Sequence, residues 1–114
     1  MIITKFEDIA VWQKSKDLNI IIYDMFKACK DYSFKDQIQR ASVSIMNNIA
    51  EGYERNGNKE FRHFLYIAKG SSAEVRSMIY LALELNYVTK DEFENTYNKS
   101  TEISKMLSGF IKTL

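Results

Sequence analysis

Residues that interrupt or cross-link a chain are scarce in this sequence of 114 residues. It contains no proline, four glycines and one cysteine. Proline breaks helices and glycine weakens them, so their scarcity favours long, uninterrupted helices. A single cysteine excludes a disulfide bond within the chain and is typical of a reducing compartment.

The sequence also lacks a long apolar run and a strong excess of either charge. Charged residues recur every few positions in residues 1–17, so the apolar core of a signal peptide is missing. No segment approaches the roughly 20 apolar residues of a membrane span. The net charge of +1 argues against a globally basic nucleic-acid binder of the histone type. These absences predict a cytoplasmic protein with no membrane partner.

Residue types that carry catalysis or bind metals are equally sparse. His63 is the one histidine, and the sequence has no phosphate-binding glycine loop, nucleophile elbow or CxxC pair. Glu60 and His63 are spaced as in one half of a ferritin-like di-iron site, but a second Glu-x-x-His is missing. We therefore predict no enzyme activity, no metal and no cofactor. A site that combines Glu60 and His63 from several subunits is the weakest alternative.

What the sequence does contain is enough apolar material for a core, with 46% hydrophobic and 13% aromatic residues. No linker or repeat divides the chain, so we expect one domain over residues 1–114. Apolar residues recur at helical spacing in four segments. These helices are expected from residues 7–9 to about 30, from 34 to 55, from 59 to about 86, and from 89 onward. Short connections between them predict an all-α fold, an antiparallel up-down-up-down four-helix bundle.

Local signals predict where these helices begin and end. Ser33 is a candidate N-cap of the second helix, whose end is expected between residues 52 and 57. Asn86 is expected to end the third helix. Thr89 and Glu92 match the capping box of the fourth helix.

The second helix is apolar on two faces. The first face consists of Phe34, Ile38, Ala41, Ile45 and Ile49. On roughly the opposite side lies a second face of Val43, Met46 and Ala50. A surface helix needs only one apolar stripe, so a helix with two is usually covered on both sides. We expect this outer face of the second helix to bury against further copies of the chain in a homo-oligomer.

A polar seam runs between these two faces. It comprises Gln37, Arg40, Ser44, Asn48 and Glu51, followed by Arg55. The seam is either a solvated edge or a buried hydrogen-bonded network, and asparagine in mid-helix favours the network because it is a poor helix former. Arg40 and Glu51 are too far apart on one helix to pair with each other. Each is therefore expected to need a partner on another helix.

The third helix carries a basic and aromatic stripe on one face. Its members are Arg62, Tyr66, Lys69, Ala73, Arg76 and Tyr80. Basic side chains can neutralise phosphates and aromatic rings can stack on unpaired bases. Alternatively, these side chains only cover the shoulder of the bundle, with packed stems and solvated heads, and the pattern alone favours this interpretation. Gly70, in the middle of the helix, is expected to allow close approach of a neighbouring backbone.

Three stretches resemble the 23S rRNA intervening-sequence protein family. They are FEDIAVWQK (6–14), QIQRASVSIMNNIAEG (37–52) and FRHFLYIAKGSSAEV (61–75). The resemblance covers nearly the whole chain and implies a four-helix bundle. Some members are labelled ribosomal proteins, and a related retroelement accessory factor forms a pentamer and associates with nucleic acid and a reverse transcriptase. This chain departs from the family pattern at Met46, where proline is common, and at Gly57, where a serine cap is common.

The residues and the resemblance together predict a non-enzymatic binding module. The resemblance implies a homo-oligomer, with a ring of five expected, that engages RNA or an RNA-handling protein. The candidate nucleic-acid contacts are Arg55, Lys59, Arg62, Tyr66, Lys69, Arg76 and Tyr80. The alternative is a protein–protein adaptor without nucleic-acid contact, whose partner binding would depend little on salt.

Overall fold

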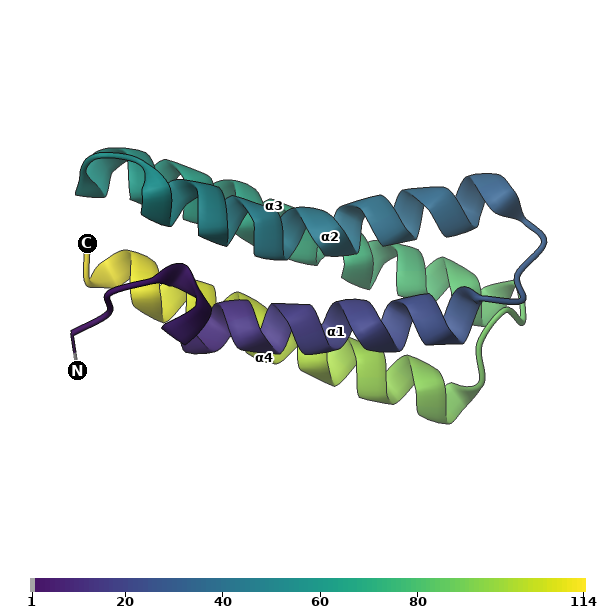
Figure 1. Cartoon of the computed structure of the whole chain (residues 1–114). Coiled ribbons are helices and arrows are strands. Elements are labelled where there is room, and N and C mark those ends of the chain that lie inside the picture. Colours follow the sequence, from purple (N-terminus) through teal and green to yellow (C-terminus); the bar gives the residue numbers. More distant parts are fainter. Residues whose placement is uncertain (1) are drawn as a thin grey trace.

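The computed structural model describes residues 2–114 as four long helices (Figure 1). A short 3-10 turn, η1 (Phe6–Asp8), precedes α1 (Ala10–Phe26), α2 (Tyr32–Glu54), α3 (Asn58–Glu84) and α4 (Lys90–Lys112). Each helix runs opposite to the one before it, and the two ends of the chain lie at the same end of the bundle. The prediction of an all-α four-helix bundle is confirmed.

The first helix is shorter than the sequence indicated. It starts after η1, just beyond the expected range 7–9, and ends at Phe26, short of Lys30. The backbone N–H of Lys27 bonds to the carbonyl of Asp24, three residues back. This tighter bond closes the last turn, because a 3-10 turn satisfies carbonyl groups that the α-helix leaves free.

The caps of α2 and α4 test two of the boundary predictions. Asp31 caps α2, since its carboxylate accepts the backbone N–H of Phe34 at 3.1 Å. The prediction of Ser33 as the cap was therefore wrong, and the helix starts earlier than expected. The capping box of α4 is confirmed: the Thr89 hydroxyl accepts the Glu92 N–H at 3.1 Å, and the Glu92 carboxylate accepts the Thr89 N–H at 2.9 Å.

Both ends of α3 depend on backbone conformations with positive φ. At its C-terminal end Asn86 has φ 59°, and the N–H groups of Tyr87 and Asn86 bond to the carbonyls of Ala82 and Leu83. This pair of bonds is a Schellman motif, so Asn86 ends α3 as predicted. At the other end Gly57 precedes the helix with φ 122°, a backbone conformation that residues other than glycine rarely adopt.

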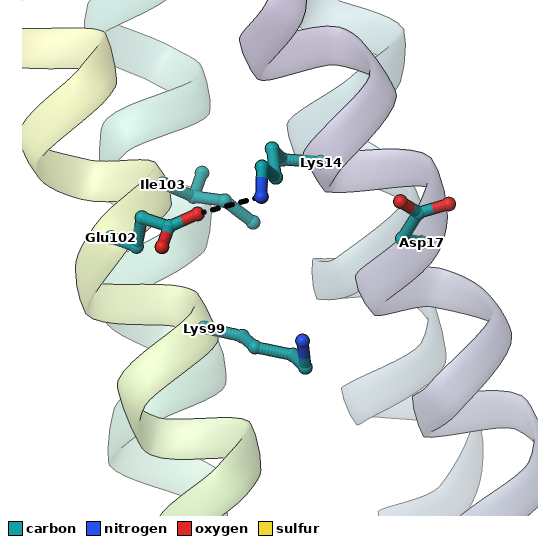
Figure 2. Close-up of a pocket in the computed structure, with 5 residues that line it drawn as sticks. All are labelled: Lys14, Asp17, Lys99, Glu102 and Ile103. Carbon is teal, nitrogen blue, oxygen red and sulfur yellow. Dashed lines mark ion pairs between the residues drawn. The ribbon is translucent and has the colours of Figure 1, made fainter.

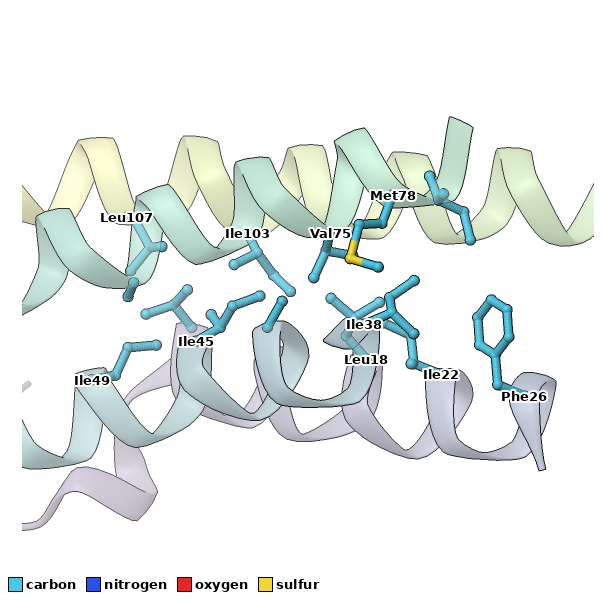
Figure 3. Packing of buried hydrophobic residues seen from close by; sticks show 14 of the residues in the cluster. Leu18, Ile22, Phe26, Ile38, Ile45, Ile49, Val75, Met78, Ile103 and Leu107 are labelled. Carbon is cyan, nitrogen blue, oxygen red and sulfur yellow. The ribbon is translucent and has the colours of Figure 1, made fainter. Parts of the chain in front are cut away.

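One cluster of buried apolar side chains lies between the four helices (Figure 3). The predicted inner face of α2 is buried in full. It meets fully buried residues of the other helices, among them Leu18, Ile22, Leu65, Val75, Ile79 and Leu107. Burying each such large side chain contributes about 1.5–3 kcal/mol. The core thus accounts for the first face of α2 and leaves the second to be explained.

A hydrogen bond joins the two connections at the end of the bundle away from the chain ends. The Tyr87 hydroxyl donates to Oδ2 of Asp31 at 2.7 Å, while the other carboxylate oxygen accepts the N–H of Phe34. The bond from Tyr87 and, to a smaller extent, the bond from the Phe34 N–H hold the pKa of Asp31 below its ordinary value of 3.8. One carboxylate therefore caps α2 and ties it to the connection between α3 and α4.

We expect Tyr87→Phe to lower the melting temperature at neutral pH, because it removes the donor and keeps the ring. The pKa of Asp31 is lowered in the folded state, so this bond stabilises the protein above pH 3.8 and its contribution is lost as the pH falls through the lower folded pKa. The deficit of the variant should therefore shrink in acid. Tyr32→Phe, at a ring that is 71% exposed, is the control. Thermal melts followed by circular dichroism measure both, and a deficit that is independent of pH contradicts the assignment.

Candidate nucleic-acid interface

The predicted stripe on α3 borders α4, and a buried serine pair fixes its middle. The Ser72 and Ser100 hydroxyls lie 2.9 Å apart, and each also lies within 3.1 Å of the other residue's carbonyl oxygen. Both serines are fully buried. The half-buried Arg76 donates from Nη1 to the Ser72 hydroxyl at 3.3 Å. The stem of Arg76 is thus packed at the α3–α4 seam while its charge stays near the surface.

Three aromatic rings form one end of this surface, and we call them the aromatic platform. The Tyr80 ring lies 5.0 Å from that of Phe93 and 5.5 Å from that of Tyr97, and the latter two stack at 5.7 Å with an interplanar angle of 23°. Tyr80 keeps 52% of its surface exposed. The nearby Tyr97 hydroxyl raises the pKa of Tyr80 above its ordinary value of 10.0. The sequence stripe included Tyr80 and missed the two rings of α4.

The other end of the stripe is an open hollow at the start of α3. It is lined by Lys59, Glu60, Arg62, His63, Phe64 and Tyr66. The guanidinium of Arg55 lies 5.1 Å from the centre of the Phe64 ring, a cation–π contact. Arg55 also pairs with Glu51 at 3.0 Å, so part of its charge is neutralised. The other candidate before Arg62 is Lys59, which forms no ion pair with the residues that the structure describes.

Lys112 joins the site from α4. Tyr66 and Lys69 of α3 line a depression together with Ser108, Ile111 and Lys112. Sequence reasoning missed Lys112 because the residue lies on another helix, far along the chain. The signal that could have found it is the antiparallel pairing of α3 and α4, which brings the end of α4 beside the first half of α3.

The cations of this surface are free, whereas several elsewhere are paired. We define the α3–α4 basic strip as Arg62, Lys69, Arg76 and Lys112. No member forms an ion pair with any residue in the range 2–114. On the α1–α4 face, by contrast, Lys14 pairs with Glu102 at 3.3 Å, and Asp17 and Lys99 lie close by (Figure 2). The strip therefore presents four cations that no ion pair within residues 2–114 neutralises.

The polar seam of α2 is a network only in its centre. The Ser44 and Ser71 hydroxyls lie 2.9 Å apart and connect α2 to α3. Asn48 donates from Nδ2 to the Ser44 carbonyl at 2.8 Å and to the Ser44 hydroxyl at 2.9 Å. Gln37 lies exposed outside this group. The network thus comprises two of the predicted members and one residue of α3.

The charged members of the seam pair within α2, contrary to expectation. Arg40 pairs with Asp36 at 2.8 Å and Glu51 with Arg55 at 3.0 Å, all four side chains being exposed. The expectation that each needs a partner on another helix was wrong. Residues four positions apart are neighbours on a helix surface, and each charge has its opposite there.

The outer face of α2 is half-buried within the single chain. Val43, Met46 and Ala50 all keep part of their surface exposed. Tyr23 of α1, which is 46% exposed, lines an open hollow with Val43 and Asn47. Self-association through this face stays a prediction.

Close helix packing occurs at Gly52, not at Gly70. A Cβ atom on Gly70 would have open space, with no atom of residues 2–114 within 4 Å, so the expected backbone approach there was wrong for this chain. A Cβ atom on the buried Gly52 would lie 2.6 Å from Cβ of Phe64 and 3.0 Å from Cδ1 of Phe61. Gly52 falls at the spacing of Ile45 and Ile49, a signal that was available in the sequence.

Residues 2–114 contain neither a metal-binding cluster nor a membrane-spanning helix. Within 2–114 no three side chains of His, Cys, Asp or Glu come together as a metal site would require. Glu60 and His63 are exposed in the hollow at the start of α3. None of the four described helices combines the length and apolarity of a membrane span.

Comparisons with known proteins assign this chain to a family. Residues 7–109 match the model of the family described as 23S rRNA-intervening sequence protein. A solved structure from Bacteroides thetaiotaomicron, a protein of unknown function from the S23 ribosomal protein family, is 30% identical with a TM-score of 0.85, and the match covers 90% of this chain and 99% of that one. A comparison with curated sequences returned no match. The chain therefore belongs to the 23S rRNA-intervening sequence protein family, as its three sequence motifs indicated.

Proposed function

We propose that this protein is a non-enzymatic, homo-oligomeric module that binds RNA through the α3–α4 basic strip. One observation carries the proposal: the strip has four cations without an ion pair to any residue of 2–114, and half-exposed tyrosines accompany them. Such cations are free to neutralise phosphates, and the release of counterions supplies most of the affinity of a nucleic-acid complex.

The anchoring of the strip supports a binding role. Arg76 is held by the buried Ser72, and Lys69 and Lys112 flank one depression on two helices. Side chains that are already oriented lose less conformational freedom when a ligand binds. Arg76, which is held by Ser72, should therefore bind a phosphate at a lower entropic cost than a lysine that extends freely into solvent.

Self-association would strengthen a site that is small in one subunit. We propose that the outer face of α2 joins copies of the chain, and that they form a ring of five. In such a ring the basic strip is repeated, so that an RNA held by one subunit meets the next at high effective concentration. Light scattering gives the subunit number, and a monomer at all concentrations contradicts this part of the proposal.

Reversing three charges of the strip tests the RNA site. We expect Arg62→Glu, Lys69→Glu and Arg76→Glu together to weaken RNA binding by roughly 100-fold or more at moderate salt, because each change replaces an attraction to phosphate with a repulsion. Helix content, measured by circular dichroism, should be unchanged. Gel shifts at fixed salt measure the binding.

The matched control reverses the same number of charges on exposed lysines outside the strip. Lys16, Lys27 and Lys30 lie on α1 or just after it. Their triple glutamate variant has the same net charge as the test variant and should retain most of the affinity. Equal losses in the two variants would mean that RNA responds to overall charge, and unchanged binding in the test variant would refute the site.

A protein–protein adaptor is the second candidate. Ile67 and Leu81 of α3 and Leu85, the residue that follows it, are 39%, 49% and 45% exposed and would offer a partner apolar surface. Partner binding that hardly changes with salt would favour this function over RNA binding.

A further inference from the structure

We infer that the α3–α4 basic strip selects unpaired RNA over double-stranded RNA, an inference that rests on the proposed function. Tyr66 and Tyr80 are 55% and 52% exposed and lie on the same face of α3, with Lys69 and Arg76 between them. The order along the helix is aromatic, cation, cation, aromatic. Cations placed between exposed rings suit a strand whose phosphates and free bases are presented together.

The aromatic platform gives one end of the strip a surface that is already in place. Phe93 and Tyr97 support the Tyr80 ring from α4, with centroids 5.0 and 5.5 Å away. A ring held by its neighbours has little freedom left to lose when a base stacks on it. Stacking on aromatic side chains tolerates any base sequence, because every base has a π-face.

A duplex cannot use these rings. In double-stranded RNA the bases already stack on one another, and proteins that bind it contact phosphates and 2′-hydroxyls across grooves over about 16 base pairs. From Arg62 to Tyr80 the strip is about 27 Å long at ~1.5 Å per helical residue. That length is too short to span the roughly 16 base pairs that duplex-binding domains contact. The dimensions and the rings of one subunit therefore both fit a short unpaired segment.

Fluorescence anisotropy with the full-length protein at one fixed salt concentration tests the inference. The probes are labelled, unstructured RNAs of about four and about eight nucleotides and a blunt RNA duplex of about 16 base pairs. We expect the longer single strand to bind roughly 10-fold more tightly than the duplex, and the shorter one to bind more weakly than the longer one, because it offers fewer phosphates and bases to the strip.

Tyrosine variants separate stacking from charge. We expect Tyr66→Ala and Tyr80→Ala each to weaken single-strand binding by roughly 10-fold and to leave duplex binding unchanged. Tyr80→Phe retains the ring and its packing on α4 and should bind as the wild type does, which excludes a role of the hydroxyl. Tyr32→Ala, at an exposed ring outside the strip, is the control for a lost surface aromatic.

The salt dependence gives a second readout. A triple variant with glutamine at Arg62, Lys69 and Arg76 loses three phosphate contacts. For a single strand each contact contributes roughly 0.7 to the slope of log K against log salt concentration, so the slope should become shallower by about 2. Duplex binding equal to single-strand binding, with tyrosine variants that change nothing, overturns the inference and leaves RNA binding itself intact. Failure of every RNA probe to bind overturns the proposed function.

Discussion

Replacing Ile45 with alanine is expected to lower the free energy of unfolding by about 2–5 kcal/mol. Ile45 is fully buried at the centre of the core, between residues of all four helices (Figure 3). The change removes buried apolar surface and leaves a cavity that long, packed helices close only in part. Urea denaturation followed by circular dichroism measures the loss, which should appear as a lower midpoint.

Met46→Ala is the matched variant because Met46 is the next residue and points away from the core. It is half-buried in the single chain, so its truncation should have a smaller effect than that of Ile45. If copies of the chain meet on this face, the destabilisation will depend on protein concentration, since assembly and folding are then linked. An effect of Met46→Ala as large as that of Ile45→Ala in dilute monomer would contradict the assignment of the two faces.

The second large effect is expected at Gly52. An added methyl group would lie 2.6 Å from Cβ of Phe64, an atom fixed close to the α3 backbone. Helices α2 and α3 must therefore separate, and we expect Gly52→Ala to destabilise the protein by about 1–3 kcal/mol despite the better helix propensity of alanine. Thermal and urea unfolding measure the change.

Gly70→Ala provides the matched control with the opposite sign. Its Cβ atom would have open space within residues 2–114, so the substitution should stabilise the protein by up to about 1 kcal/mol through helix propensity alone. Stabilisation by both substitutions would show that α2 and α3 are less closely packed at Gly52 than the structure indicates. Destabilisation by Gly70→Ala would show that another copy of the chain occupies this space.

Sequence periodicity predicted the core well because each helix repeats its buried residues on one stripe. The inner face of α2, from Phe34 to Ile49, is buried as expected. The Thr89 capping box was also predictable, since its partners are three residues apart. The cap of α2 was not predictable from local sequence, because Ser33 and Asp31 are both good cap residues. The bond that holds Asp31 in place comes from Tyr87, in a distant part of the chain.

The candidate site likewise has one part that the sequence predicted and another that it did not. Arg62, Lys69, Arg76 and Tyr80 could be grouped from their spacing on one helix. The contribution of α4 depends in addition on the antiparallel pairing of α3 and α4, because no local pattern relates Lys112 or Tyr97 to α3. Sequence spacing also left open whether these cations are neutralised, which depends on acids brought near by the fold.

The sequence by itself determined that the chain is a bundle of four helices, which side of each helix is buried, and to which family it belongs. These properties depend on residues close together along the chain, whose spacing sets what one helix face presents. Only the tertiary structure decided that Gly52 is where two helices meet closely and that Arg40 and Glu51 are neutralised within α2. It alone decided that the free cations of α3 lie beside rings and a lysine of α4, because contacts between helices depend on how whole helices pack together.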